Sequence, residues 1–273
     1  MRVRKPSWVD QFYPGDPERA RRMWEEFFAE CKSPKISSDI RAIQVPHAGW
    51  VYSGQAAAEA YQQIEGGEYS SVVMIGPQHR VPAAHIQVYP DGVWKSPLGN
   101  LEVDGELAKR FSDSNDAFKL DEASHKPEHS LEVQIPPLAM VAPDIKIVPI
   151  LTTAFVKEHI SILARSLEEI VGNNDSILVL VSSDLYHGES YAACKESDAR
   201  TIELLGKLDA DGLSKAFRAG SAAACGADGL IAILEAKDGL GITKAHHLAS
   251  YNSNDATGMR GGYVVGYSAF AFT

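Results

Sequence analysis

The chain has 273 residues, of which 45% are hydrophobic and 23% charged, which is ordinary usage for a folded globular protein. This length is enough to bury a substantial core, and the composition excludes a disordered, collagen-like or disulfide-scaffold protein. With 26 Lys and Arg residues against 36 Asp and Glu, the formal net charge is -10, which argues against nucleic acid as a partner.

The cysteines and the apolar runs of the sequence indicate where the protein works. Residues 1–14 lack the continuous apolar run of a signal peptide, and no stretch of about eighteen uncharged apolar residues is present to span a membrane. Cys31, Cys194 and Cys225 contain no CxxC pair, which argues against a disulfide framework or a zinc ribbon. We therefore expect reduced thiols, a cytoplasmic location and no membrane partner.

Apolar spacing predicts alternating helices and strands in one domain that covers residues 1–273. In chain order, the pattern predicts a helix at 18–30, a strand at 40–45, a helix at 56–61, a strand at 71–75, helices at 103–111 and 130–141, a strand at 145–151, a helix at 156–171, a strand at 177–181, helices at 198–208 and 222–236, and paired strands at 245–252 and 263–272. Gly54 is expected to form a turn before the second helix, and Pro136 and Pro137 to bend or break the fourth. The alternation predicts an α/β layered fold.

Histidines follow three of the predicted strands. His47 lies in VPHAG, His79 in GPQH and His187 in SSDLYH, each directly after an apolar run. Because ligand crevices in open α/β sheets lie beyond the carboxyl ends of the strands, these three side chains are candidates for one site. A structural role is the simpler explanation for any single histidine, but three at three strand ends indicate a functional centre.

His47 and His79 are predicted to be metal ligands. Imidazole suits iron, copper, zinc and nickel, and two histidines with a third, anionic ligand leave positions open for substrate or dioxygen. Cys225, in AAACG, is the candidate for that third ligand because we expect it at the start of a helix, whose dipole favours a thiolate. A buried, unreactive thiol is the alternative.

Two further pairs are candidates for acid/base work and substrate contact. Asp184 precedes His187, and a carboxylate beside an imidazole orients it and tunes its proton affinity, so His187 is the candidate base. The alternative is that Asp184 only caps the following turn and that His187 only hydrogen-bonds to the backbone. His129 and Glu132 lie three residues apart and share a face if their segment is helical, which suits a role in supporting the metal ligands or in binding substrate; simple helix capping by Ser130 is the alternative.

The segments quoted above resemble the Memo family, also called protein B of the AmmeMemoRadiSam system, nearly from end to end. The matching motifs are FYP from Phe12, PHAGWVYSG from Pro46, GPQH from Gly76, SPLGNLEVD from Ser96, EHSLEVQIP from Glu128, SSDLYH from Ser182 and ACG from Ala224. The resemblance implies one three-layer α/β/α domain with a central mixed sheet, similar to the class III extradiol dioxygenases.

The resemblance also implies site roles. Two histidines and a cysteine of the family replace the two histidines and one glutamate that bind metal in those dioxygenases, so His47, His79 and Cys225 correspond to the ligands. His187 matches the acid/base histidine of the dioxygenases, with Asp184 in the same motif.

Other positions in the family motifs look like pocket wall and substrate contacts. These are His129, Glu132, Trp50 and Tyr186. Arg80 follows His79 where the family often has an aromatic residue or a second histidine, and a cation there favours an anionic substrate.

Together with the resemblance, these residues lead us to expect a mononuclear, iron-dependent oxidoreductase similar to the dioxygenases, with Fe(II) as the metal and copper or zinc as alternatives. The substrate is expected to be a small molecule or a peptide. A second hypothesis is a non-catalytic binding or scaffold protein, and the resemblance implies AMMECR1-like and radical-SAM proteins as its partners. A third is zinc-dependent hydrolysis, with His187 or Glu132 activating a bound water.

Overall fold

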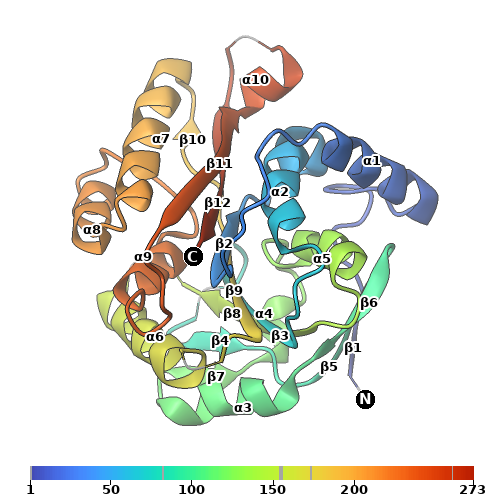
Figure 1. The fold of residues 1–273 in the computed structure, drawn as a ribbon, viewed down its shortest axis with the longest axis vertical. Helices are drawn as coiled ribbons and strands as arrows, with labels where there is room; N and C mark the ends of the chain where they lie inside the picture. Colours follow the sequence, from blue (N-terminus) through green and yellow to red (C-terminus); the bar gives the residue numbers. More distant parts are fainter. Residues whose placement is uncertain (1, 82, 154–155, 173, 260) are drawn as a thin grey trace.

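Helices cover both faces of a central sheet in the computed structural model, which describes residues 2–81, 83–153, 156–172, 174–259 and 261–273 (Figure 1). The strands are β1 (Val3–Arg4), β2 (Ala42–Val45), β3 (Ser71–Pro77), β4 (Ile86–Val88), β5 (Gly92–Ser96), β6 (Gly99–Val103), β7 (Phe118–Leu120), β8 (Lys146–Thr152), β9 (Ile177–Ser182), β10 (His187–Gly188), β11 (Ala245–Asn252) and β12 (Val264–Phe272). The helices are α1 (Pro17–Ala29), α2 (Trp50–Ile64), α3 (Gly105–Ser114), α4 (Glu122–His125), the 3-10 helix η1 (Glu132–Gln134), α5 (Ile135–Val141), α6 (Lys157–Ile170), α7 (Tyr191–Gly206), α8 (Ala210–Arg218), α9 (Ala227–Glu235) and α10 (Ser253–Thr257).

The sheet is mixed, as predicted. Its order among the described residues is β1-β5-β6-β8-β3-β9-β2-β12-β10, with β11 on β12 and with β4 on β7 and β8. The centre of the sheet is parallel, since β8, β3, β9 and β2 all run the same way. β12 is antiparallel to β2, and its antiparallel pairing with β11 confirms the predicted strand pair near the carboxyl terminus.

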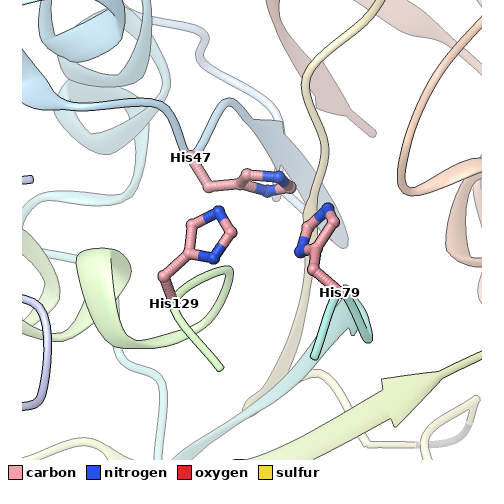
Figure 2. A group of neighbouring side chains, drawn as sticks. All are labelled: His47, His79 and His129. Atoms are coloured by element: carbon pink, nitrogen blue, oxygen red, sulfur yellow. The ribbon is translucent and has the colours of Figure 1, made fainter. Parts of the chain in front are cut away.

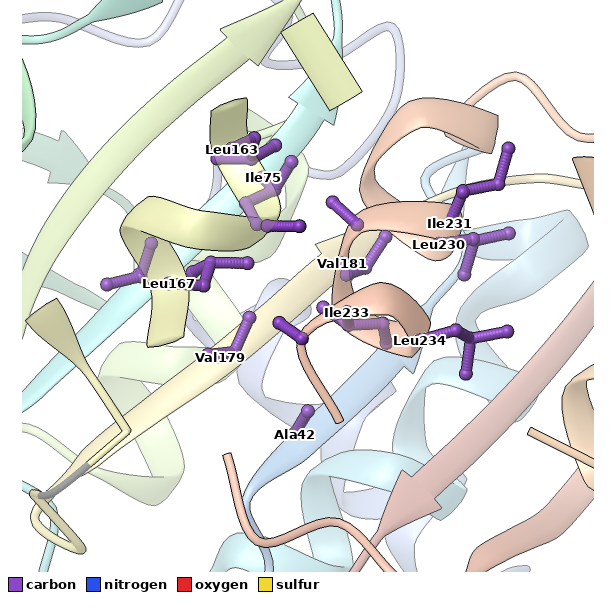
Figure 3. Close-up of a cluster of buried hydrophobic side chains, with 14 of the residues drawn as sticks. Ala42, Ile75, Leu163, Leu167, Val179, Val181, Leu230, Ile231, Ile233 and Leu234 are labelled. Carbon is purple, nitrogen blue, oxygen red and sulfur yellow. The ribbon is translucent and has the colours of Figure 1, made fainter. Parts of the chain in front are cut away.

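Alternate side chains of the central strands point into two separate cores, which makes the fold three-layered. In β9, Val179 and Val181 belong to the core under α3, α6 and α9, where they lie near Leu163 of α6 and Leu230 of α9 (Figure 3). Leu180 belongs to the opposite core, under α1, α2 and α5. Strands buried on both faces read as continuous apolar runs, which explains why the sequence predicts them well.

Several predicted boundaries are wrong, for reasons of packing. Helix α2 begins at Trp50, so Gly54 is inside the helix rather than in a turn; a Cβ there would overlap the ring of Phe27 on α1. The break predicted at Pro136 and Pro137 is confirmed: the segment 130–141 divides into η1 and α5, and the prolines occupy the first turn of α5, where proline needs no hydrogen-bonded N–H.

Short strands and helices account for the elements that the sequence missed. Strands β4 to β7, between residues 86 and 120, are three to five residues long, too short for a clear period. Val103, predicted as helical, is the last residue of β6, and the helix predicted at 222–236 is only α9. No helix in the described part of the chain has both the length and the apolar character needed to cross a membrane.

Candidate metal centre

His47 lies just beyond the end of β2 with its ring fully fixed. Its side chain is 2% exposed, and its Nδ1 lies 2.9 Å from Ser182 Oγ. That hydroxyl donates its one hydrogen to the Ser130 carbonyl at 2.7 Å, so it accepts from His47. The neutral ring therefore carries its hydrogen on Nδ1, and the Nε2 lone pair is available.

His79 lies beyond the end of β3, and Glu128 holds it. His79 Nδ1 is 2.9 Å from Glu128 Oε1, and the His79 backbone N–H donates to Glu128 Oε2 at 2.6 Å. Burial alone would raise the pKa of Glu128, but the His129 and His79 rings outweigh this and hold that pKa well below its usual range. Glu128 is thus an anion beside the histidines, a contact typical of metal-binding histidines.

His129, which precedes η1, completes a cluster of three imidazoles (Figure 2). Its ring stacks on His79 with centroids 4.7 Å apart, and one ring nitrogen of each of His47, His79 and His129 lies within 4.8 Å of the others. These atoms are close enough to bind one metal ion. Burial, together with the neighbouring His129 and His79, lowers the pKa of His47 well below its usual value, so His47 is neutral, as a metal ligand must be.

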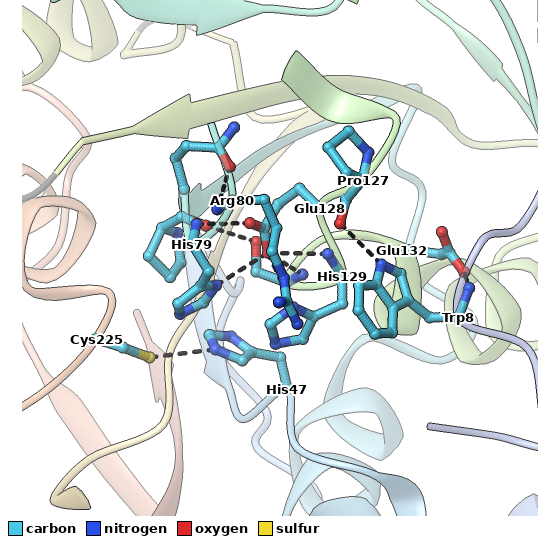
Figure 4. Close-up of polar contacts among 12 residues, drawn as sticks. Trp8, His47, His79, Arg80, Pro127, Glu128, His129, Glu132 and Cys225 are labelled. Atoms are coloured by element: carbon cyan, nitrogen blue, oxygen red, sulfur yellow. Dashed lines mark hydrogen bonds and ion pairs between the residues drawn. The ribbon is translucent and has the colours of Figure 1, made fainter. Parts of the chain in front are cut away.

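Cys225 lies against His47, from a different part of the chain (Figure 4). Its Sγ is 3.2 Å from His47 Nε2 and accepts the Asp184 backbone N–H at 3.2 Å. Gly226 permits this approach, because a Cβ there would lie 2.7 Å from the Ser182 carbonyl. Contrary to the sequence prediction, Cys225 is outside α9, and burial, followed by the nearby Asp184, raises the pKa of the thiol. A bound cation is what would deprotonate it.

A cavity of about 450 Å³ opens beside the cluster and includes His129, Asp184 and His187 in its wall. The predicted orientation of His187 by Asp184 is wrong: His187 Nδ1 lies 3.0 Å from the Leu185 carbonyl, which fixes the hydrogen on Nδ1 and leaves Nε2 free. Asp184 instead accepts the His47 backbone N–H at 2.7 Å. Burial raises the pKa of Asp184.

Glu132 binds the amino-terminal segment of the chain. Its carboxylate accepts hydrogen bonds from the Ser7 and Trp8 backbone N–H groups and from the Tyr13 hydroxyl, at 2.7–2.9 Å. It also pairs with Arg4 Nη1 at 2.8 Å, and the two side chains are 2% and 1% exposed. Glu132, predicted to contact substrate, is not among the described residues that line the cavity.

Residues 4–13, which we call the N-terminal latch, form one side of the histidine cluster. The rings of Trp8 and Phe12 pack on His129, with centroids 5.6 and 4.6 Å away. Arg80, predicted to bind an anionic substrate, instead places its guanidinium 4.6 Å from the centre of the Trp8 ring. The latch therefore covers His129 and engages the cation that the sequence assigned to the substrate.

Trp50 and Tyr186 also lie outside the described cavity wall. Trp50 is buried and stacks on Tyr13, with ring centroids 5.0 Å apart, so it joins the latch to α2. The Tyr186 backbone N–H donates to Asp198 at 3.1 Å, which anchors the segment before His187. The structure thus brings together His47, His79 and His129 and places Cys225 against His47, while these two aromatic residues lie outside the cavity wall.

His125, buried beneath the latch, makes the stability of the fold depend on pH. Arg4 donates to its carbonyl, and burial lowers the pKa of its ring from 6.5 to about 3. Between these values the unfolded chain binds more protons than the folded protein, so stability is lost as the pH falls below 6.5. At about pH 5 the loss from this group is about 2 kcal/mol.

Urea unfolding at about pH 7.5 and about pH 5 should show that His125→Gln removes this part of the pH dependence. An unchanged pH dependence in the variant would contradict the assignment.

The model of the family described as Memo-like protein matches residues 4–271 of this chain. The chain belongs to the Memo family. A MEMO1 family protein from Desulfurococcus amylolyticus is 33% identical over 283 residues, covering 100% of this chain and 99% of the relative. One from Sulfolobus acidocaldarius is 32% identical, covering 99% of each chain.

Among solved structures, the crystal structure of an uncharacterized protein from Escherichia coli K12 has the same fold. The TM-score is 0.56 at 12% sequence identity, and the match covers 86% of this chain and all of the other. At this identity the likeness concerns the fold alone. It supports the three-layer α/β architecture that the sequence predicts.

Sequence reasoning missed two residues that shape the site, Glu128 and Ser182. Each binds the Nδ1 side of a candidate ligand, His79 and His47 respectively. Both lie inside motifs noted in the sequence, EHSLEVQIP and SSDLYH. Each is therefore a hydrogen-bond acceptor within a motif that contains a histidine. The histidine that it contacts, however, is a different one, far away in the sequence.

Proposed function

We propose that the chain binds one metal ion between His47 and His79, with the Cys225 thiolate as the anionic ligand. The donor set fits such an ion, because both imidazoles have Nδ1 engaged by an acceptor and Nε2 available. Cys225 Sγ and His47 Nε2 are 3.2 Å apart, so one ion can contact both. The proposed metal is Fe(II); copper and zinc are the other ions that accept this mixture of imidazole and thiolate.

The proposed activity is metal-dependent oxidation of a small molecule by dioxygen in the 450 Å³ cavity. Bound Fe(II) would supply one-electron chemistry at positions that the protein ligands leave open. His129 contacts the substrate from the cavity wall, and His187 moves a proton through Nε2, since Nδ1 faces the Leu185 carbonyl. The observation that supports this most is that His129 of the histidine cluster and a separate histidine, His187, line the same cavity.

A non-catalytic role has one observation in its favour. The cavity wall includes large side chains that are exposed at the surface, namely Tyr52 at 42%, Met259 at 65% and Tyr263 at 63%. Exposed apolar groups around a hollow are typical of surfaces that bind a partner. The alternative function is therefore a binding protein for a peptide or for a partner such as an AMMECR1-like or radical-SAM protein.

Metal analysis of protein purified without oxygen or chelators tests the proposed site. We expect near-stoichiometric iron in the wild type. Cys225→Ser should weaken binding by more than about 100-fold, beyond what the loss of an outer-shell partner causes. The Co(II)-substituted wild type should show a thiolate-to-metal charge-transfer band that the variant lacks. His129→Ala, the matched comparison, should keep both the metal and the band.

The opposite pattern would overturn the ligand assignment. If Cys225→Ser keeps the metal while His129→Ala loses it, the three histidines form the ligand set instead. If the wild type binds no ferrous, cuprous or zinc ion even after reconstitution, the enzyme proposal fails. The binding-protein alternative then gains support.

A further inference from the structure

Glu128 is a buried carboxylate that faces two histidines of the cluster at once (Figure 4). Its side chain is 1% exposed. Oε1 lies 2.9 Å from His79 Nδ1 and 3.1 Å from His129 Nδ1. The backbone N–H groups of His129 and Ser130 also donate to Oε1, at 2.9 and 2.8 Å, while Oε2 accepts the His79 N–H at 2.6 Å.

This arrangement restricts which ring nitrogen of each histidine carries hydrogen. An ionised carboxylate accepts hydrogen bonds and donates none, so the Nδ1 atom that faces it must bear the hydrogen in a neutral ring. The lone pair of His79 is then on Nε2, on the side away from Glu128. His129 Nδ1 faces the same oxygen at 3.1 Å but makes no hydrogen bond in the described structure, so this geometry fixes the hydrogen of His79 alone.

The position of Glu128 is itself fixed by packing. The Glu128 carbonyl accepts from Arg4 Nη2 at 2.9 Å, and the Ser130 hydroxyl donates to the Pro77 carbonyl at 2.9 Å, which ties this segment to the end of β3. Gly76 permits that approach, because a Cβ there would lie 2.7 Å from the Leu131 side chain. Glu128 therefore does not need to rearrange when a ligand arrives.

We propose that Glu128 is the positioning residue of the centre: it fixes the hydrogen and the orientation of the His79 ring, and holds the His129 backbone through its N–H group, before metal binds. The metal affinity of the site depends on this preorganisation, because outer-shell acceptors of this kind change affinity by about 10–100-fold. The affinity part of the inference rests on the proposed metal site. The orientation of the His79 ring does not depend on a metal, because it follows from the contacts with Glu128.

Glu128→Gln is the direct test. Glutamine has nearly the shape of glutamate, but its side-chain NH₂ group cannot accept hydrogen bonds. Because N–H donors now face both carboxylate oxygens, at least one of the present contacts is lost. We expect the Kd for Fe(II) and Zn²⁺ to rise by about 10–100-fold. In the metal-free protein, ¹H–¹⁵N spectra of the histidine side chains should show that the wild-type His79 carries its hydrogen on Nδ1 and that the variant mixes both forms. Glu128→Asp keeps the charge but is one methylene shorter, and we expect it to lose affinity as well.

Glu59→Gln is the matched control. Glu59 is also buried and accepts two backbone N–H groups, from Lys32 and Ser33 at 2.8 and 2.9 Å, but it contacts no histidine in the described structure. It should keep the wild-type Kd and histidine spectra. Wild-type affinity and spectra in both Glu128 variants would overturn the inference. If the wild type binds no metal, the proposed function fails, while the spectra of the metal-free protein still decide the role of Glu128.

Discussion

Glu132→Ala is expected to lower the free energy of unfolding by about 3–5 kcal/mol, because it leaves one charge of a buried ion pair without its partner. The charge left without its ion-pair partner is that of Arg4, whose side chain is 2% exposed. The same change removes the acceptor for Ser7, Trp8 and Tyr13. Urea unfolding at neutral pH measures the loss.

A surface pair provides the control for this prediction. Asp113 pairs with Lys109 four residues earlier on α3, and both side chains are more than half exposed. Asp113→Ala should therefore cost less than about 1 kcal/mol. If Glu132→Ala costs no more than this control, the N-terminal latch is not part of the cooperative fold. Limited proteolysis should also cleave residues 4–13 faster in Glu132→Ala than in the control variant.

The sequence predicts the centre of the molecule well because burial there leaves a local pattern. The strand predicted at 71–75 is apolar at every position except Ser71, the one predicted at 177–181 is apolar throughout, and they become β3 and β9. His47 and His79 come close together because each follows the end of a strand, as the general rule for α/β sheets implies, while His187 lines the cavity beside His129. These features need only short stretches of sequence to be recognised.

The parts that were missed depend on contacts between distant segments. Glu132 and Arg4 are 128 positions apart, and nothing near either residue indicates that the carboxylate is fully used by the latch. The same holds for Glu128, whose partner His79 lies 49 positions away. Arg80 is predicted to contact substrate because it follows a candidate ligand. Its guanidinium instead packs on Trp8, which lies much earlier in the sequence. Spacing along the chain cannot report such pairs.

His47→Ala is expected to have the largest effect on the proposed metal centre. His47 contacts Cys225, faces His79 and His129, and is the most buried of the three imidazoles. Because outer-shell changes already weaken metal binding by about 10–100-fold, losing this ligand should exceed about 100-fold. The variant should still fold, since Gln134 Nε2 continues to donate to the Ser182 hydroxyl at 2.8 Å.

The effect can be measured as metal-linked stability, which requires no substrate. A ligand that binds only the folded protein stabilises it by about 2.7 kcal/mol at a free concentration of about 100 times its Kd. Anaerobic Fe(II) at that concentration should therefore raise the unfolding free energy of the wild type and of His159→Ala, a control histidine on α6, by this amount. It should stabilise His47→Ala by less than about 0.4 kcal/mol, because the metal concentration is then no higher than the weakened Kd. Equal stabilisation of all three proteins would place the metal elsewhere on the chain and remove His47 from the site.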